Sequence, residues 1–512
     1  MTPVRVGDWL TAAAGFQGDR EALIEGERRP TYSELNARVN QLADALATAG
    51  VVKGDRVALF ATDSIEYVEV IFACIKLGAT YVPLNYRLSE PELLLLLRTS
   101  GARHLFVGGR YGPMIEAVRS GVPDLRTVVS FDGPGPAIDV VYEDLIARGR
   151  DLEPDVDVDD DDLLGIAFTS GTTGTPKGVL HHQRVVKHFT WQTFVEARIP
   201  PGVVNYSPSP LYHNAGLLYV FAGIARGFTS LISPEFEAGR VLGLLQGGEL
   251  SRCFLVPTMI SSLLELPGAA DFDYDNLQCI SYGGAPMSPA LLRRAMDVFD
   301  CDFINMFGAG TEAGLQTLLG PEEHRRALNG EEHLLNSIGR PAAGVTLRLV
   351  DEEFNDVPDG EVGEIVTRSD VIMAGYLDQA AESAGKVVNG WYRGGDMAWR
   401  DSEGYLYLGG RRSDMIIRGG ENVYPNEIES VLADLPGVVE VAVIGVPDAH
   451  WGEIVRAVVV MAEGSPFDDA AAVELCRSRL AAYKVPAEFR EMTSLPKNPS
   501  GKILKRELRR LP

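Results

Sequence analysis

The chain has 512 residues, of which 46% are hydrophobic and 23% are charged. The length suggests about three folding units, and the balance is typical of globular proteins, so disorder as the dominant state is excluded. The net charge of −24 disfavours nucleic acid and anionic membrane surfaces as partners. A small anionic substrate is compatible with this charge, because a local cluster of hydrogen-bond donors can outweigh the negative electrostatic field of the whole protein.

The five cysteines are widely spaced and include no CxxC pair, so the sequence predicts neither a disulfide framework nor a zinc site. The N-terminal stretch has Asp8 within its apolar part and lacks the apolar core of a signal peptide. The most apolar long run, Leu217 to Ile232, is interrupted by Arg226 and is too short to cross a bilayer. We therefore expect a soluble, cytoplasmic protein with no transmembrane segment.

The first hundred residues alternate between helical and strand patterns. A capping box at 31–34 precedes a helical face that runs over 35–46. The elements predicted next are a strand, a helix and a strand, at 57–60, 65–77 and 80–82. This order with short connections predicts a βαβ unit and a largely parallel sheet.

The same alternation continues to about residue 410. The predicted elements in this part are strands at 163–168, 251–256 and 279–282 and a helix at 289–299. We expect the acidic run from Asp155 to Asp162 to be a solvated linker or turn. Around 360–366 the pattern changes to short strands and turns, which indicates a small β-rich subdomain.

From Arg411 the chain is predicted to form a separate compact unit, with a hinge near 410–414. Its predicted elements are a helix at 425–435, strands at 438–446 and 455–461, and a helix at 470–482. The predicted fold class is therefore α/β. A large N-terminal domain (1–410) of parallel-sheet αβ layers, with the small β-rich subdomain, is followed by a small, mobile α+β C-terminal domain (411–512).

The most informative stretch is TSGTTGTPKG (169–178), which directly follows an apolar strand. Its glycines let the backbone approach an anion closely, its hydroxyls and amides are donors, and Lys177 supplies a charge suited to a phosphate. The spacing differs from that of a Walker A loop, GxxxxGK[ST], so a P-loop kinase is disfavoured. The alternative, a flexible surface loop, does not account for the whole pattern after a buried strand.

This segment resembles the phosphate-binding signature of adenylate-forming enzymes, which include acyl-CoA synthetases, luciferases and peptide-synthetase adenylation domains. Six further blocks are similar to family blocks: KLGATYVPLN (76–85), YGGAPMS (282–288), GEVGEI (360–365), GWYRGGD (390–396), GRRSDMIIRGGENVYPNEIE (410–429) and NPSGKILKREL (498–508). The resemblance covers nearly the whole chain. Within it, RGGENVYP (418–425) is closer to fatty- and aryl-acid CoA ligases than to amino-acid adenylation domains.

The resemblance implies an ATP-dependent carboxylate–CoA ligase, an acid–thiol ligase that forms AMP. In such enzymes a carboxylate attacks the α-phosphate of ATP, which gives an acyl-adenylate and pyrophosphate, and a thiol then displaces AMP. The implied reactants are a fatty or aryl carboxylic acid, ATP and coenzyme A, and the implied metal cofactor is Mg²⁺.

The resemblance also implies roles for residues around the nucleotide. Lys502 would be the catalytic cation at the α-phosphate, Thr311 would donate to the phosphate and Glu312 would bind Mg²⁺. The other residues implied to bind ATP are Thr169, Ser170, Gly171, Thr172, Thr173, Gly174 and Lys177 at the phosphates, Gly283, Gly284, Ala285 and Phe307 at adenine, and Asp396 and Arg411 at the ribose. For Phe307, core packing is a rival explanation.

The acid pocket and the hinge are implied in the same way. The implied acid-pocket residues are Tyr212, His213, Tyr282 and Gly308, with His213 as a gate or, alternatively, as a core histidine. The implied residues on the hinge and the CoA side are Ser413, Asp414, Gly419, Gly420 and Glu421. The chain departs from the family pattern twice. One extra residue lies between Phe307 and Glu312, where we expect a bulge, and Ser413 stands where Asp or Lys is usual.

Other functions stay open at this point. A stand-alone adenylating enzyme could load a carrier protein or activate another oxyanion. A non-catalytic acyl-nucleotide binder is disfavoured, because Lys177, Glu312, Asp396 and Lys502 are all present. A homodimer is also compatible with the sequence.

Overall fold

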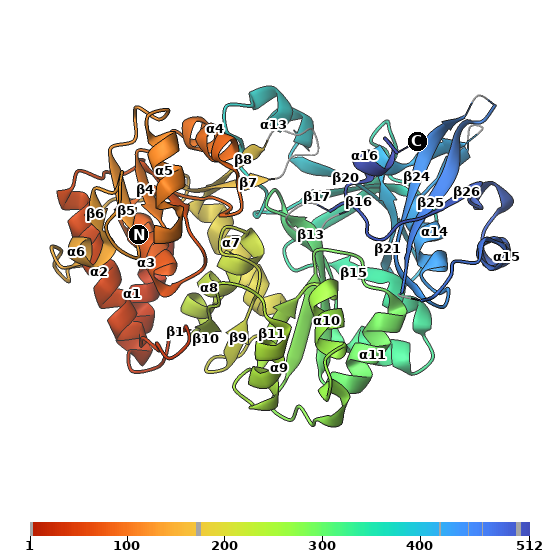
Figure 1. Ribbon diagram of the computed structural model, residues 1–512, viewed down its shortest axis with the longest axis horizontal. Helices are drawn as coiled ribbons and strands as arrows, with labels where there is room; N and C mark the ends of the chain where they lie inside the picture. Colours follow the sequence, from red (N-terminus) through yellow and green to blue (C-terminus); the bar gives the residue numbers. More distant parts are fainter. Residues whose placement is uncertain are drawn as a thin grey trace.

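The computed structural model describes residues 4–169, 176–418, 421–448, 450–462, 464–497 and 503–511. The strands of this part of the chain form three sheets, which we call the N-terminal, central and C-terminal sheets (Figure 1). Helices pack against all three sheets. The predicted α/β fold is confirmed.

The N-terminal sheet has the strand order β18-β8-β7-β3-β2-β4-β5-β6. Its strands are β2 (Arg56–Phe60), β3 (Thr80–Pro83), β4 (His104–Val107), β5 (Thr127–Ser130), β6 (Val140–Val141), β7 (Leu163–Thr169), β8 (Lys177–His182) and β18 (Gly375–Tyr376). The strands from β7 to β6 along this order are parallel, as the predicted βαβ unit requires. By contrast, β8 and β18 are antiparallel to their neighbours, so the sheet is mixed at this edge.

The central sheet has the order β1-β10-β9-β11-β12-β13-β14-β15-β21-β20-β17-β16, with β19 beside β20. Its strands are β1 (Leu23–Ile24), β9 (Val204–Tyr206), β10 (Thr229–Leu231), β11 (Arg252–Leu255), β12 (Cys279–Gly283), β13 (Asp302–Gly310), β14 (Gly314–Leu319), β15 (Ser337–Pro341), β16 (Thr346–Val350), β17 (Gly363–Arg368), β19 (Val387–Val388), β20 (Trp391–Arg400) and β21 (Leu406–Arg411). The strands from β1 to β13 are parallel, and the later ones are antiparallel. The later strands include the short strands predicted around 360–366.

Helices line both faces of the two larger sheets (Figure 1). Those that share a core with the inner face of the N-terminal sheet are α1 (Val6–Gln17), α2 (Tyr32–Thr48), α3 (Ile65–Leu77), α6 (Tyr142–Ile146), α7 (Gln183–Glu196) and α8 (Asn214–Arg226). Its outer face packs against α4 (Glu90–Ser100) and α5 (Gly112–Arg119), and the central sheet packs against α9 (Ala238–Gln246), α10 (Pro257–Leu264), α11 (Pro289–Phe299) and α12 (Pro321–Leu328). Burial on both faces explains why the parallel strands are almost continuously apolar.

Two predicted helices show how local signals set their ends. The capping box of Thr31 and Glu34 is present at the start of α2, as predicted. The helix α3 begins at the N-cap Ser64 and ends at Gly78, whose φ of 65° favours glycine.

The C-terminal sheet has the order β23-β22-β25-β24, with β26 beside β25. Its strands are β22 (Ile416–Arg418), β23 (Glu421–Val423), β24 (Val438–Asp448), β25 (Gly452–Met461) and β26 (Glu488–Glu491). One face packs against α14 (Pro425–Leu432) and α15 (Asp469–Arg479), and the other packs against α16 (Lys505–Leu508). This blue part of the chain lies at one end of the molecule in Figure 1, where α14 contacts β21.

Three further expectations concern the chain as a whole. All five cysteines are described and are free thiols, and four of them are buried. None of the described helices is long and apolar enough to span a bilayer. The acidic run at 155–162 is a loop, but Asp160, Asp161 and Asp162 form ion pairs with Lys187, Arg184 and Lys53 respectively, so part of it is neutralised and not merely solvated.

Candidate active site

The hairpin of β7 and β8 carries both ends of the expected phosphate loop. Thr169 is the register partner of Lys177 across this antiparallel pair, so the two ends of the loop lie side by side. The residues between them that we expect to bind phosphate, namely Ser170, Gly171, Thr172, Thr173 and Gly174, lie outside the described residues.

Lys177 lies in a cluster that the sequence did not predict. Its ammonium group forms an ion pair with Glu382 of α13 (Ala380–Lys386) and lies 5.3 Å from the centre of the Tyr376 ring. Tyr376 reaches this position because β18 pairs with β8, so that Tyr376 is opposite Val179. The Tyr376 hydroxyl in turn donates to Oε1 of Glu312 at 3.4 Å. One tyrosine therefore contacts the expected phosphate-binding lysine and the expected metal ligand.

Glu312 lies in a turn whose backbone is held from several sides. Its N–H donates to the carbonyl of Ala309 at 3.1 Å, and its carbonyl accepts from the N–H of Met373 at 2.7 Å. The carbonyl of the preceding Thr311 lies 2.7 Å from Nε2 of His181. Burial raises the pKa of the Glu312 carboxyl, and the positive charges of Lys386 and Arg411 oppose this shift. A desolvated carboxylate of this kind is a suitable place for a cation.

The extra residue between Phe307 and Glu312 is accommodated in the hairpin of β13 and β14. The register is irregular between Phe307 and Gly308 and again between Gly308 and Gly310, which leaves Ala309 without a register partner. This irregularity is the expected bulge. Gly308 has no room for a side chain, since a Cβ there would lie 2.0 Å from the carbonyl oxygen of Gly314. The Phe307 ring is partly buried and packs against the apolar cluster formed by the strands of the β-rich part. Phe307 therefore does take part in core packing, the alternative explanation for this residue.

Asp396 and Arg411 face each other on β20 and β21. They are register partners, and the Asp396 carboxylate lies 3.2 Å from Nε of Arg411. Tyr392, on the same strand as Asp396, is buried, and its pKa is raised by burial and by the nearby acidic groups of Glu312, Tyr376 and Asp396. Tyr392 therefore lies near both the expected metal ligand and the expected ribose-binding pair.

The end of β12 presents backbone, not side chains. Gly283 packs so closely that a Cβ would lie 2.3 Å from the carbonyl oxygen of Met306, while Gly284 and Ala285 are exposed. The Tyr282 side chain is buried in the core, where its hydroxyl lies 2.9 Å from Nε2 of His324. The Tyr282 side chain therefore packs in the core, and it is the backbone of Tyr282 that borders the adjoining site.

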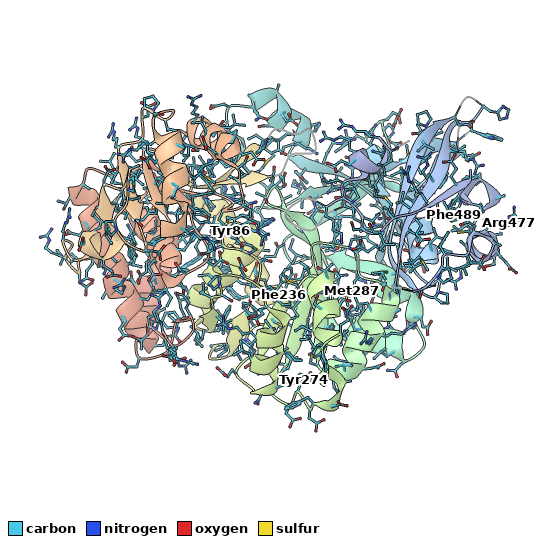
Figure 2. All side chains as sticks on the ribbon, in the orientation of Figure 1. Tyr86, Phe236, Tyr274, Met287, Arg477 and Phe489 are labelled. Atoms are coloured by element: carbon cyan, nitrogen blue, oxygen red, sulfur yellow. The ribbon has the colours of Figure 1, made fainter. Side chains whose placement is uncertain are left out.

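Tyr212 and His213 lie in the turn that precedes α8. The Tyr212 ring packs edge-on against Tyr86, which is labelled in Figure 2, with 5.6 Å between ring centres, and lies 5.8 Å from the His213 ring. His213 is surrounded by enough protein that desolvation lowers its pKa, yet its side chain is accessible to solvent.

The residues expected at the hinge are only partly described. Ser413 and Asp414 lie in a short 3₁₀ turn after β21, and the Asp414 carboxylate accepts from Arg509 at 2.9 Å. Glu421 is exposed at the start of β23, opposite Arg418. Gly419, Gly420 and Lys502 lie outside the described residues.

Four residues of this site were not singled out from the sequence, namely His181, Tyr376, Glu382 and Tyr392. Tyr392 lies inside the block GWYRGGD, so its position beside Asp396 could have been inferred from that block. The other three come from segments with no distinctive spacing. Tyr376 and Glu382 reach the site through the pairing of β18 with β8 and the packing of α13, and His181 is placed by the pairing of β8 with β7.

Comparison with known proteins agrees with this geometry. Residues 10–377 match the sequence model of the AMP-binding enzyme family, and residues 427–502 match that of the AMP-binding enzyme C-terminal domain. The chain therefore belongs to the AMP-binding enzyme family, in its branch of AMP-forming acid–CoA ligases.

Three relatives illustrate the range of this branch. The long-chain-fatty-acid–CoA ligase FadD13 of Mycobacterium tuberculosis is 36% identical over 483 residues, which cover 94% of this chain and 93% of that one. The fatty acid–[acyl-carrier-protein] ligase ScoC of Streptomyces coeruleorubidus is 34% identical over 95% of this chain and 92% of its own. The crystal structure of the anthranilate CoA ligase AuaEII with anthranoyl-AMP superimposes with a TM-score of 0.89 at 26% identity, covering 99% of this chain and 97% of that one.

Proposed function

We propose that the protein activates a fatty or aryl carboxylic acid with ATP and then transfers the acyl group to coenzyme A. In the first step an oxygen of the acid attacks the α-phosphorus, and the bond to pyrophosphate breaks. In the second step the CoA sulfur attacks the acyl carbon, and AMP leaves. The observation that carries the proposal is the cluster around Tyr376 and Tyr392, which brings Lys177, Glu312, Asp396 and Arg411 to one place.

Each member of this cluster has chemistry suited to one part of ATP. Lys177 is a compact cation for phosphate oxygens, once Glu382 releases it. The Asp396 carboxylate accepts hydrogen bonds from the ribose hydroxyls, and Arg411 beside it adds fixed donors. The exposed backbone of Gly284 and Ala285 provides a flat surface for adenine.

Mg²⁺ fits the residues that are present. This ion takes one or two carboxylates and completes its shell with phosphate oxygens and water, and Glu312 offers one desolvated carboxylate. The described residues include no group of three or more His, Cys, Asp and Glu side chains that would hold a metal alone. Glu312 would hold the ion together with phosphate oxygens of the nucleotide, and the ion would supply positive charge at the phosphates.

The acid and the thiol approach this cluster from other elements. His213 is exposed in the turn before α8, beside the Tyr212 ring, so we assign it to the acid site. Lys502 is assigned to the α-phosphate in the first step, and the segment around Gly419, Gly420 and Glu421 is assigned to the second. Rotation of the C-terminal domain (411–512) near Ser413 and Asp414 would exchange the two segments.

The test is pyrophosphate release from ATP and Mg²⁺ with a panel of fatty and aryl acids, with and without CoA, and with the products identified by mass. Acid-dependent release with an acyl-CoA product is expected. No release with any acid would contradict the proposal.

A second acceptor is favoured by one observation, the similarity to ScoC, whose name specifies an acyl-carrier protein. The same assay separates the two acceptors. Acid-dependent release that yields only acyl-AMP, and an acylated product when a phosphopantetheinylated carrier protein is added, would favour the carrier over CoA.

The ribose assignment makes its own prediction. Asp396→Ala should raise the KM for ATP by about 10- to 100-fold, since hydrogen bonds to a charged group are lost. The wild type should also prefer ATP to 3′-deoxy-ATP, and this preference should vanish in the variant. Asp359→Ala, which removes an exposed carboxylate paired with Arg400, is the control and should leave both values unchanged. A variant that still discriminates against 3′-deoxy-ATP would contradict the assignment.

A further inference from the structure

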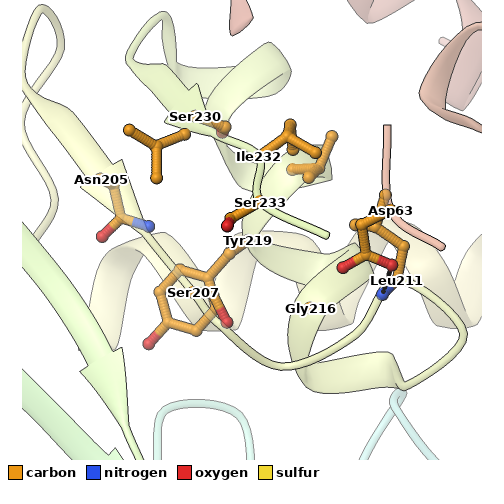
Figure 3. Close-up of a pocket in the computed structure, with 11 residues that line it drawn as sticks. Asp63, Asn205, Ser207, Leu211, Gly216, Tyr219, Ser230, Ile232 and Ser233 are labelled. Atoms are coloured by element: carbon orange, nitrogen blue, oxygen red, sulfur yellow. Dashed lines mark hydrogen bonds between the residues drawn. The ribbon is translucent and has the colours of Figure 1, made fainter. Parts of the chain in front are cut away.

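A small polar pocket lies directly behind the turn that carries Tyr212 and His213 (Figure 3). It has room for about one water molecule. The polar side chains that line it are Asp63, Asn205, Ser207, Tyr219, Ser230 and Ser233. None of these residues was singled out from the sequence, and the proposed function does not use them.

Asp63 is the residue that connects this pocket to the turn. It lies in the loop between β2 and α3, and it is 6% exposed. Its Oδ1 accepts a hydrogen bond from the backbone N–H of Leu211 at 2.9 Å, and Figure 3 shows the two residues next to each other. The bond joins segments 148 residues apart, so it ties the end of a strand in the N-terminal sheet to the turn before α8.

The turn packs into the apolar core through Leu211, which is 3% exposed and clusters with Val220 and Ile232, but the pocket beside it also presents polar groups. Nδ2 of Asn205 and Oγ of Ser230 are buried and find no hydrogen-bond partner among the described residues. Leaving such groups dry is costly, and a polar pocket of this size takes up water. Packing holds the Leu211 side chain in the core, and the hydrogen bond from its N–H to Asp63 holds the backbone of the turn where it borders this polar pocket.

A backbone N–H is a fixed donor, so its acceptor sets where the turn lies. The next residues after Leu211 are Tyr212 and His213, and the N–H of His213 donates to the carbonyl of Pro210 at 2.8 Å. The turn is therefore compact, and a shift at Leu211 moves the His213 ring with it.

We propose that Asp63 is a positioning residue for acid binding: its carboxyl group holds the turn at 210–213 and thereby presents His213 to the carboxylic acid. The inference rests on the proposed function, in which His213 borders the acid. Burial raises the pKa of Asp63 to about 8, and in either protonation state its carboxyl group offers an oxygen acceptor to the Leu211 N–H. Asparagine is then a close replacement, and leucine removes the acceptor while keeping the size.

Three variants distinguish a role of Asp63 in positioning the turn from a role in folding. Asp63→Leu should raise the KM for the acid by about 10-fold or more and leave the KM for ATP within about twofold, because only the acid site is displaced. Asp63→Asn should restore the KM for the acid to within about threefold of the wild type. The matched control is Asp55→Asn: Asp55 is equally buried and also accepts a backbone N–H, that of Val52 at 3.1 Å. This control should leave the KM for the acid unchanged.

Hydrogen exchange provides a readout that does not depend on activity. The Leu211 amide should exchange faster in Asp63→Leu than in the wild type or in Asp63→Asn. An unchanged KM for the acid together with unchanged exchange at Leu211 would overturn the inference and leave the proposed function intact. If the wild type releases no pyrophosphate with any acid, the proposed function fails, and the exchange measurement still decides whether Asp63 holds the turn. Should Asp63→Leu not fold, Asp63→Ala takes its place with the same expected results.

Discussion

The variant Lys502→Ala is expected to form acyl-AMP about 100- to 1000-fold more slowly than the wild type, which is the usual effect of removing one positioned electrostatic partner of a transition state. Thioester formation from supplied acyl-AMP and CoA should change by less than about threefold, because no bond to phosphorus forms or breaks in that step. The two half-reactions are measured separately, the first as acid-dependent pyrophosphate exchange and the second as acyl-CoA formed from synthetic acyl-AMP.

The control for this variant is Lys497→Ala. Lys497 lies in the same C-terminal segment and forms an ion pair with Glu440 on β24. It should leave both half-reactions near the wild-type rates. Equal losses in the two half-reactions of Lys502→Ala would show that Lys502 supports the fold or the rotation of the domain and not the first step.

The variant Glu312→Gln is expected to lower the rate of acyl-AMP formation by about 100-fold or more and to raise the Mg²⁺ concentration needed for half-maximal rate. Its unfolding temperature in the absence of nucleotide should not fall at pH 7. The fold raises the pKa of the Glu312 carboxyl. At any pH above the ordinary pKa of a glutamate, the ionised group therefore destabilises the folded protein. The neutral amide of glutamine removes this destabilisation. The difference in stability should vanish below about pH 4, where the carboxyl is neutral in both folded and unfolded chains.

Glu361→Gln removes an exposed carboxylate at the edge of the β-rich strands and serves as the control for both measurements. It should change neither the Mg²⁺ requirement nor the dependence of stability on pH. A Glu312→Gln variant that is markedly less stable than the wild type at pH 7 would mean that the carboxylate supports the fold and is not held there for a cation.

Sequence reasoning succeeded where the signals are local. The ends of α3 follow from Ser64 and Gly78, and the start of α2 follows from Thr31 and Glu34, because caps act within one turn of the chain. The antiparallel strand β8 was not predicted, since the run from Lys177 to His182 has no alternation that separates it from the preceding loop.

The site likewise has features that the sequence predicts and features that it does not. The paired positions of Asp396 and Arg411 were expected from the resemblance, and the structure brings them together on neighbouring strands. The position of Tyr376 depends on a strand that returns from almost 200 residues away to pair with β8, and no local pattern carries this information. The direction of the Tyr282 side chain was equally hidden, because a buried strand is apolar on both faces and its sequence does not say which face meets the site.

Under the proposed function, the ion pair between Lys177 and Glu382 would affect how nucleotides leave the enzyme as well as how they bind. Because Glu382 is attached to the same chain, it competes with any incoming phosphate for the one ammonium group. The apparent affinity for a phosphate is reduced by the fraction of molecules in which this pair is closed. The triphosphate of ATP would make enough contacts with the site to open the ion pair. Pyrophosphate and AMP, once separated, would each make fewer contacts. Re-formation of the pair would then assist product release and would disfavour binding of inorganic phosphate from the surrounding solution.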